Sequence, residues 1–264
     1  MIPAAVHFDW HTFTNYLLPP DGPTWRALWT TVYIAVIAQS FGVLFGLLSA
    51  LAQLSRSRVL GVVSGVYVWF FRGTPVIVQI FFAYFGANLF LGFDLFPRTV
   101  GIGPVSVSGA IAAGTVALAV NEGAYMSEII RAGIRAVDTG QMEAAKSIGM
   151  PPALAMRRIV LPQAARIIVP PLGNEFNNML KTTSLLAFIG VRELFQDADI
   201  RYSASFKATE YFLGVAVLYL LLTTIWTLIQ VQIERRLGAS DRPEDEKWTA
   251  RLLGIGISQP AGVR

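Results

Sequence analysis

The sequence contains no cysteine and only two histidines, His7 and His11, and just 14% of its 264 residues are charged. The missing cysteines exclude a disulfide framework and a thiolate-bound metal, and two histidines near the start do not make a histidine-rich metal centre. The same absences leave no pairing of nucleophile and general base of the kind that hydrolytic enzymes use. We therefore expect neither a catalytic residue nor a metal or other cofactor bound by this chain.

Two sequence motifs are also missing. The chain has no Gly-x-x-x-x-Gly-Lys-Ser/Thr loop, and Lys146-Ser147 follows an alanine in place of a glycine-rich turn. Any ATP that the protein uses must therefore be bound by another polypeptide. The first 24 residues mix polar, apolar and proline residues without the basic and apolar regions of a signal peptide, so we expect no cleaved leader.

Apolar residues, in contrast, make up 54% of the chain. A soluble domain of this length does not need so much apolar surface, so we expect an all-α protein whose solvent is the lipid bilayer. Five segments reach the roughly 20 residues that cross a hydrocarbon core of about 30 Å. The expected spans are residues 27–54, 59–93, 105–130, 167–191 and 211–233.

The second expected span is too long for one straight crossing, because a helix rises only about 1.5 Å per residue. It contains Arg72-Gly73-Thr74-Pro75, where Pro75 removes a helical hydrogen bond and glycine weakens the helix. We expect a tilted lead-in up to Phe71 and a structural kink at Pro75, beside the intramembrane charge of Arg72. A split into two spans is the alternative, and it would place both termini on one side.

Lysine and arginine are distributed unevenly between the segments that connect these spans. Fourteen of the 21 lie in the first connection, the third connection and the C-terminal tail, five lie on the opposite side, and two lie within spans. Because cytoplasmic segments are enriched in basic residues, we expect the N-terminus outside and the C-terminus inside. This topology accounts for the net charge of +4, and no basic patch on a soluble module indicates nucleic-acid binding.

A polar segment at residues 138–162 separates the third and fourth expected spans. Asp138 is a suitable N-cap for a short helix, Gly149 suits a left-handed helix end, and Pro151-Pro152 suits the first turn of a second helix. Ala144-Ala145 allows another surface to approach the backbone closely. We expect a pair of short helices that docks a soluble partner.

Polar and charged residues inside the third and fourth spans are costly in lipid unless they are paired or face water. On a helix, Asn174, Asn178 and Lys181 share one side, so the fourth span has a polar face that should point into the bundle or toward a dimer partner. We predict that a transport pathway is lined by Glu122, Asn178, Lys181, Thr182 and Ser184. The alternative is a packing network, in which Glu122 or Glu175 pairs with Lys181 or Arg72.

Two Gly-x-x-x-Gly pairs lie near the start of the chain, Gly42 with Gly46 and Gly61 with Gly65. Small residues four positions apart let helices approach closely in lipid. Glycine is also common in membrane helices generally, so either pair can be without a packing role.

The polar segment resembles the cytoplasmic loop of the permease subunits of bacterial ABC importers. Its anchors are Glu143-Ala144-Ala145, then Gly149, then Ile159-Val160-Leu161-Pro162. Other blocks resemble the polar amino-acid branch of this family, the histidine, glutamine, arginine and glutamate-type permeases. These blocks are Arg72-Gly73-Thr74-Pro75, Asn121-Glu122-Gly123-Ala124-Tyr125-Met126, Leu161-Pro162-Gln163-Ala164, Pro170-Pro171-Leu172-Gly173-Asn174 and Lys181-Thr182-Thr183-Ser184-Leu185. The resemblance covers about residues 25–236.

The resemblance implies a five-span subunit that pairs with a second permease, identical or paralogous. It implies two copies of an ATPase, which hold ATP and magnesium, and a substrate-binding protein on the outer side. It also implies that Glu143, Ala144, Ala145 and Gly149 couple the permease to the ATPase. The expected domains are an outer segment at 1–24, a permease domain at 25–236 and a cytoplasmic tail at 237–264. The expected activity is alternating-access import of polar amino acids through a bacterial cytoplasmic membrane.

The block at Lys181 departs from the family pattern at one position. Many members have an aspartate where this chain has Thr182, and an acid there can engage a cationic substrate. The departure argues against a basic amino acid without excluding one, because Glu122 and Glu175 remain available. Two other functions stay open at this point, an ion-coupled secondary transporter and an intramembrane enzyme, each relying on Glu122 or Glu175.

Overall fold

A computed structural model describes residues 7–18, 20–102 and 105–238 of the chain. Over these residues the protein is mainly helical, as the sequence predicts. The chain divides into two compact units, one formed by Met1–Ala132 with Asn178–Leu220 and the other by Gly133–Asn177 with Leu221–Arg264.

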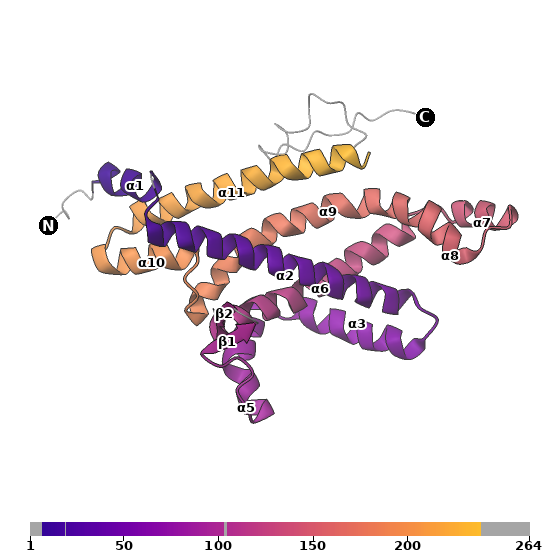
Figure 1. The fold of residues 1–264 in the computed structure, drawn as a ribbon, viewed down its shortest axis with the longest axis horizontal. Helices are drawn as coiled ribbons and strands as arrows, with labels where there is room; N and C mark the ends of the chain where they lie inside the picture. The colour runs from indigo at the N-terminus through magenta and orange to yellow at the C-terminus, as the bar shows by residue number, and fades with distance from the viewer. Residues whose placement is uncertain (1–6, 19, 103–104, 239–264) are drawn as a thin grey trace. The chain divides into compact units, whose positions relative to one another are not determined.

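Figure 1 labels most of the elements, which follow one another along the chain. They are α1 (Trp10–Leu17), α2 (Gly22–Leu54), α3 (Arg58–Gly73), α4 (Val76–Phe81), the π-helix η1 (Phe82–Gly86), α5 (Ala87–Leu91), β1 (Thr99–Ile102), β2 (Val105–Ser108), α6 (Gly109–Arg135), α7 (Thr139–Ser147), α8 (Pro152–Ala155), the π-helix η2 (Met156–Val160), α9 (Leu161–Thr182), the 3-10 helix η3 (Thr183–Ile189), α10 (Leu194–Ser205) and α11 (Ala208–Arg236).

Among the described residues, two helices are long and apolar enough to cross a membrane, α2 and α11. A third crossing is added if the bent pair of Arg58–Gly73 and Val76–Gly86 counts as one span. These three correspond to the first, fifth and second expected spans. The third and fourth expected spans correspond to α6 and to α9 with η3, which do not reach the same apolarity. Both carry the polar clusters that the sequence singled out, and polar side chains lower the hydropathy of a segment.

The second expected span is broken where the sequence predicts. Gly73 ends α3, and Pro75 is the N-cap of α4. The two arms meet at 105°, which is far more than a kink in a single crossing. Proline cannot donate the hydrogen bond that would continue the helix, and the residue before it avoids helical dihedral angles. Thr74 accordingly has an extended backbone.

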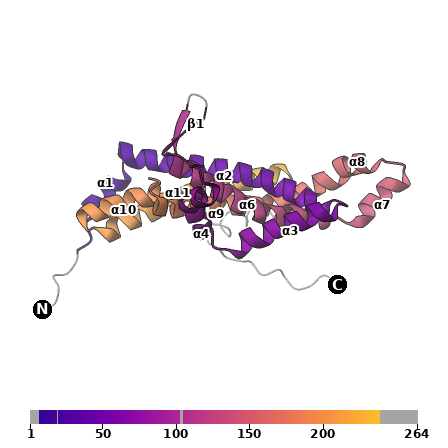
Figure 2. The ribbon, with the colours of Figure 1, turned by 90° about the horizontal axis from the view of Figure 1, so that it is seen from below.

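The start of the third expected span is wrong in detail, because residues 105–108 are extended. They form β2, which pairs antiparallel with β1 so that Thr99 faces Ser108. Alternating valine and serine in β2, beside Thr99 and Val100, is the pattern of a strand. The amide of Gly109 donates to the carbonyl of Arg98 at 3.1 Å, and α6 begins at that point. Figure 2 shows this hairpin projecting away from α2.

Within the first unit, α2 packs closely on α6 through one of the two glycine pairs. A Cβ atom on Gly42 would lie 2.6 Å from the Cγ atom of Glu122, and one on Gly46 would lie 2.3 Å from the Cβ atom of Met126. The prediction of close packing is therefore confirmed for Gly42 and Gly46. A Cβ atom on Gly61 or Gly65 would meet nothing within 4 Å, so this second pair makes no close contact in the described part of the chain.

A cluster of serine hydroxyls joins α2, α3 and α6 about one helical turn beyond Gly46. The Oγ atoms of Ser49 and Ser64 are 2.6 Å apart, and those of Ser49 and Ser127 are 2.8 Å apart. All three serines are buried. Tyr67 on α3 adds a hydrogen bond of 2.6 Å to the carbonyl of Val120 on α6. Such small polar groups hold helices together in lipid, where apolar burial contributes little to helix association.

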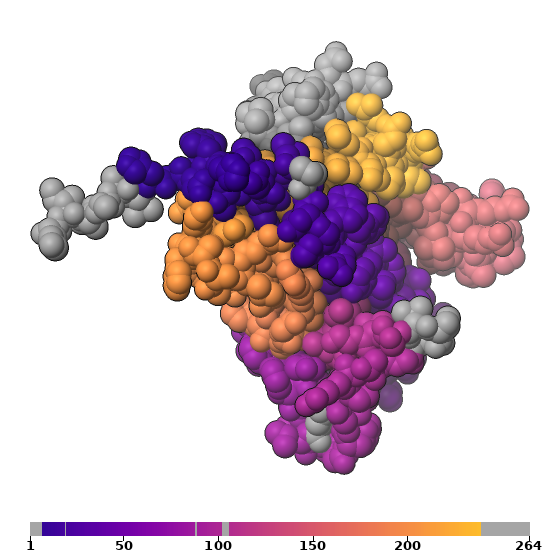
Figure 3. All heavy atoms as spheres, turned by 60° about the vertical axis from the view of Figure 1, so that its left-hand side comes forward, coloured from indigo at the N-terminus to yellow at the C-terminus, as the bar shows by residue number. Residues whose placement is uncertain are grey.

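The first unit also contains α1, α10 and the beginning of α11, which pack together. Tyr16 is buried against Gly214, and its ring meets the ring of Tyr211 edge-on at 5.4 Å. The space-filling view shows the indigo atoms of α1 lying on the orange atoms of α10 and the start of α11 (Figure 3).

In the second unit, the short helices α7 and α8 pack with the end of α6 and the start of α9. Its core is Val137, Val160 and Ala164, covered by four further apolar side chains. In the same unit α11 braces α9. The Trp226 indole donates to the carbonyl of Gly173 at 2.8 Å, and the Gln230 amide donates to that of Pro170 at 3.2 Å.

We predict that Gly46→Ala destabilises the chain by about 1–3 kcal/mol, the usual cost of overpacking. The added methyl group would collide with the backbone of Met126 and Ser127, whose atoms lie 2.9 Å away and cannot rotate aside. Gly61→Ala is the matched control, because it enters open space and improves helix propensity. Thermal unfolding of the purified chain in detergent checks this, and equal stability of the two variants would contradict it.

Candidate functional site

The polar segment forms two helical pieces with the predicted caps. The Asp138 carboxylate accepts from the amide of Gly140 at 2.8 Å at the start of α7. Gly149 has a φ of +80°, and the chain closes a Schellman turn around it. The Gly149 amide donates to the carbonyl of Lys146 at 2.9 Å, and the Met150 amide donates to that of Ala145 at 3.0 Å. Pro152 then occupies the first turn of α8.

The sequence predicted that the second piece is a separate short helix, and this prediction is wrong. The turn α8 continues through η2 into α9 without an intervening break. Leu161-Pro162 lies where the π-helix η2 passes into α9, and proline has no amide hydrogen to donate to the preceding turn. The polar segment is therefore the beginning of the same helical run that carries Asn178 and Lys181.

The residues assigned to coupling present a surface around the turn. Glu143, Ala144 and Gly149 are exposed, whereas Ala145 is 2% exposed and packs inward. Sequence reasoning missed Ile148, which is 78% exposed on the same turn. Ile148 therefore adds an apolar side chain to the exposed surface formed by Glu143, Ala144 and Gly149.

The predicted pathway residues lie in two environments. Asn174, Asn178 and Lys181 are exposed, which agrees with their predicted common face on α9. Thr182 and Ser184 are half-buried, and the Thr182 hydroxyl donates to the carbonyl of Asn178 at 2.9 Å.

Glu122 is instead 6% exposed, packed against α2. The Gln39 amide donates to its Oε1 atom at 3.1 Å, and Gly42 makes room for its side chain. This position favours the packing role that the sequence left open for Glu122. Glu175 is half-buried on α9.

Arg72 has a different partner from those suggested by the sequence. Its Nη1 atom lies 3.9 Å from the Glu128 carboxylate, and its guanidinium lies over the Tyr125 ring at 5.3 Å from the centroid. Tyr125 and Glu128 are three residues apart on α6 and so share one side of the helix. Arg131 also binds Glu128, through two hydrogen bonds.

Two side-chain amides bind the backbone at the break before Pro75. Gln79 donates to the carbonyls of Phe71 at 2.9 Å and Thr74 at 3.1 Å. Asn121 on α6 donates to the same Phe71 carbonyl and to the Gln79 side-chain oxygen, both at 3.0 Å. In lipid, carbonyls freed by a helix break must find donors within the protein. Gln79 was missed from the sequence, although an amide four residues beyond Pro75 in an apolar run is the feature that should have identified it.

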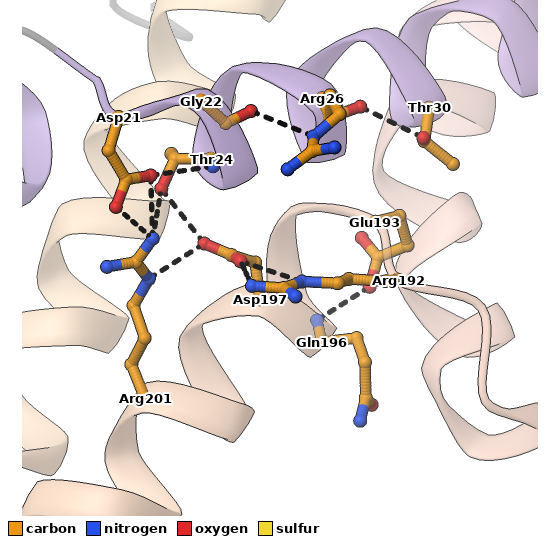
Figure 4. Close-up of polar contacts among 10 residues, drawn as sticks. All are labelled: Asp21, Gly22, Thr24, Arg26, Thr30, Arg192, Glu193, Gln196, Asp197 and Arg201. Carbon is orange, nitrogen blue, oxygen red and sulfur yellow. Dashed lines mark hydrogen bonds and ion pairs between the residues drawn. The ribbon is translucent and has the colours of Figure 1, made fainter.

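A network of charges surrounds Asp197 on α10 (Figure 4). Its carboxylate is fully buried and accepts from Arg192 at 2.6 Å, Arg201 at 3.0 Å and the Thr24 hydroxyl at 2.9 Å. Arg201 also binds Asp21, the N-cap of α2, at 2.6 Å. Burial opposes ionisation of Asp21, but hydrogen bonds from Arg201 and Thr24 hold its pKa below the usual value. The network fixes α10 to the start of α2.

Sequence reasoning also missed this network. Asp197 and Arg201 stand one helical turn apart, which indicates an ion pair, but nothing in the sequence relates them to Asp21. Among the described residues, no group of three or more histidine, aspartate or glutamate side chains is arranged to hold a metal ion.

The sequence profile of a family described as "Binding-protein-dependent transport system inner membrane component" matches residues 42–239. The chain belongs to this family. It is a permease subunit, a transport component of an inner membrane and not an enzyme. The two other functions that the sequence left open are thereby set aside.

Similar proteins agree with the family. The permease is 38% identical to "Probable amino-acid permease protein YxeN" of Bacillus subtilis, over 81% of this chain and 90% of that protein. It is 37% identical to "Arginine transport system permease protein ArgU" of Corynebacterium glutamicum, over 93% and 76%. A solved structure titled "Crystal structure of an amino acid ABC transporter with histidines" matches with a TM-score of 0.74 and 36% identity, over 87% of this chain and 99% of that one.

We predict that Asn121→Leu destabilises the permease by about 1–3 kcal/mol, because it removes one of two donors to the part-buried Phe71 carbonyl and the donor to the Gln79 side-chain oxygen. Asn178→Leu is the matched control, since the same change there affects an exposed side chain. The two variants change the hydrophobicity of the chain by the same amount. Unfolding in detergent compares their stabilities. An equal or larger loss for Asn178→Leu would contradict a structural role for the Asn121 amide.

Proposed function

We propose that this permease forms half of the pathway of an ATP-driven importer for polar amino acids. The observation that carries the proposal is the family match together with relatives named for amino-acid transport. The amino-acid transporter structure that covers most of the chain supports the same substrate class. Measuring which amino acids stimulate ATP hydrolysis by the purified complex tests it, and stimulation by none of them would reject it.

The proposed topology has five crossings with the N-terminus outside. The first is α2, the second is the bent pair α3–α4, the third is α6, the fourth is α9 with η3, and the fifth is α11. Residues 1–24 then lie outside, 25–236 form the permease domain, and 237–264 form a cytoplasmic tail. The excess of basic residues supports this orientation.

A membrane-impermeant thiol reagent should label a cysteine introduced at position 199 in intact cells and spare one at position 146.

The proposed assembly supplies what this chain lacks. Two ATPase subunits hold ATP and magnesium, a second permease copy or paralogue completes the pathway, and an outer binding protein delivers the amino acid. ATP binding closes the ATPases and so shifts the permease between outward-open and inward-open states. Such a shift requires that each ligand bind the two states with different affinity.

Coupling is assigned to α7, the turn at Gly149 and α8. The exposed surface of Glu143, Ala144 and Ile148 suits a groove on a soluble ATPase, because small residues permit close approach and an apolar anchor adds affinity. The segment is also the start of the helical run into α9, which gives a direct route for displacement.

We predict that Gly149→Val and Glu143→Ala uncouple ATP hydrolysis from transport. Valine resists the positive φ that the turn requires. Gly149→Asn is the matched control, because asparagine tolerates this conformation. Substrate-stimulated ATPase activity of the reconstituted complex should fall for the first two and persist for Gly149→Asn. Normal transport by both Gly149→Val and Glu143→Ala would contradict the assignment.

The amino acid is proposed to pass the polar face of α9 and η3, formed by Asn178, Lys181, Thr182 and Ser184. An amino acid carries an ammonium and a carboxylate, and neither can lose water without replacement partners. The amide and hydroxyl groups, with Lys181, suit the carboxylate. Glu122 remains a candidate for the ammonium, but its contacts with α2 support packing at least as well. Arg72, Pro75 and Glu175 are proposed to be structural.

We predict that Thr182→Asp shifts transport toward arginine and lysine relative to uncharged amino acids. A carboxylate on the pathway would attract the cationic side chain of the substrate. Thr182→Asn is the control, since it has a similar size without the charge. Competitive uptake into proteoliposomes measures the shift, and an assembled Thr182→Asp variant with an unchanged substrate profile would place Thr182 off the pathway.

A further inference from the structure

The short helix α1 has three distinct sides. Asp9, Thr12 and Tyr16 point toward α10 and α11, His11 and Asn15 form a polar side, and Trp10, Phe13 and Leu17 form an apolar side. Positions 10, 13 and 17 recur at the spacing that places side chains on one side of a helix. A helix with one side on protein, one in water and one apolar side is suited to the edge of a bilayer.

The protein side of α1 is held by several contacts at once. The Asp9 amide donates to the Glu210 carboxylate at 2.8 Å, and Lys207 donates to the Asp9 carboxylate at 2.6 Å. Lys207 holds the pKa of Asp9 well below its usual range, so the pair stays charged. The Arg201 guanidinium lies over the Tyr16 ring at 5.3 Å. These contacts fix the rotation of α1 and turn its acidic residue away from the apolar side.

On the apolar side of α1, Trp10 is exposed, whereas Phe13 and Leu17 are half-buried. Trp10 is 68% exposed, and its ring packs edge-on against Phe8 at 4.8 Å and Phe13 at 6.0 Å. Thr14 adjoins this side, and its hydroxyl donates to the carbonyl of Trp10 at 2.8 Å, so it needs no water. The aromatic cluster therefore carries no charge, and the indole N–H of Trp10 is a donor of the kind that tryptophan places at the wet edge of a membrane.

The apolar side of α1 is close in the chain to the lipid-facing surface of α2. The span α2 begins at Gly22, and its first turns expose Trp25 and Trp29, whose rings meet edge-on at 6.2 Å. Tryptophan is enriched where a span leaves the hydrocarbon core. Because Leu17 ends α1 shortly before Gly22, and Arg201 binds both Asp21 and the Tyr16 ring, α1 is kept at this level.

We propose that α1 is an interfacial helix whose aromatic side, Trp10, Phe13 and Leu17, lies among the lipid headgroups beside Trp25 and Trp29. Helices of this kind place tryptophan, phenylalanine and leucine at the boundary of headgroups and acyl chains. The lipid contact, added to the ion pairs, anchors α10 and the start of α11 at the membrane surface. The proposal holds for either orientation of the chain in the membrane.

Spin labels on single cysteines test this directly, because the chain has no cysteine of its own. Labels at positions 10 and 17, on the complete complex in liposomes, should be more accessible to oxygen than to a water-soluble nickel chelate. A label at position 15 is the matched control on the polar side and should show the reverse. Equal access of nickel to all three positions would overturn the proposal.

Two further outcomes distinguish lipid from protein as the cover. Nickel access at positions 10 and 17 that is lost only on adding the binding protein would assign this side to that partner and overturn the proposal. Dipolar broadening between labels at position 10 would assign the apolar side to a second permease copy and overturn the proposal.

The unmodified protein gives an independent measurement with lipids brominated near the headgroup. These lipids should quench its tryptophan emission more than that of Trp10→Phe, and equal quenching would contradict the assignment.

Discussion

The first unit depends on the close contact between α2 and α6 at Gly42 and Gly46. No side chain atom fits between the helices there, so the distance between them is set by backbone and by the side chains of Glu122 and Met126. In lipid, such close contacts take the place of the hydrophobic effect, which packs the helices of soluble proteins. The serine cluster and the Gln39–Glu122 hydrogen bond become possible only at this separation, and both place polar groups where they are satisfied.

This contact also fixes what α6 can contribute elsewhere. With Glu122 turned toward α2, the neighbouring Asn121 reaches the break in the second span, and Tyr125 and Glu128 meet Arg72. The polar residues of α6 therefore serve mainly to satisfy other groups of the protein. On α9, the exposed side chains of Asn178 and Lys181 do not satisfy other groups of the protein in the contacts that the structure describes. The proposed pathway therefore rests more on α9 than on α6.

Local features of the chain could be predicted from the sequence, and features that join distant segments could not. The caps at Asp138 and Gly149, the break at Pro75 and the common face of Asn174, Asn178 and Lys181 each follow from one residue type and its spacing. Tertiary structure alone decides that Gly42 and Gly46 pack closely while Gly61 and Gly65 do not, because the two motifs are identical. The same holds for the partner of Arg72 and for the ion pair between Asp21 and Arg201, which are 180 residues apart. The strands at residues 99–102 and 105–108 could not be predicted, because their valines suit a span as well as a strand.

The path from the coupling segment to the proposed transport residues is weakened in the middle of α9. Pro170 and Pro171 lie inside α9, and each removes a hydrogen bond from the helix. A displacement at α8 could be absorbed there before it reached Lys181. The braces from α11 lie at this place, because Trp226 binds the carbonyl of Gly173 and Gln230 binds that of Pro170. Gly173 has no room for a side chain beside Gln230, so the two helices are held close where the backbone is weakest. Under the proposed mechanism, α11 would keep α9 stiff enough to carry movement past its prolines.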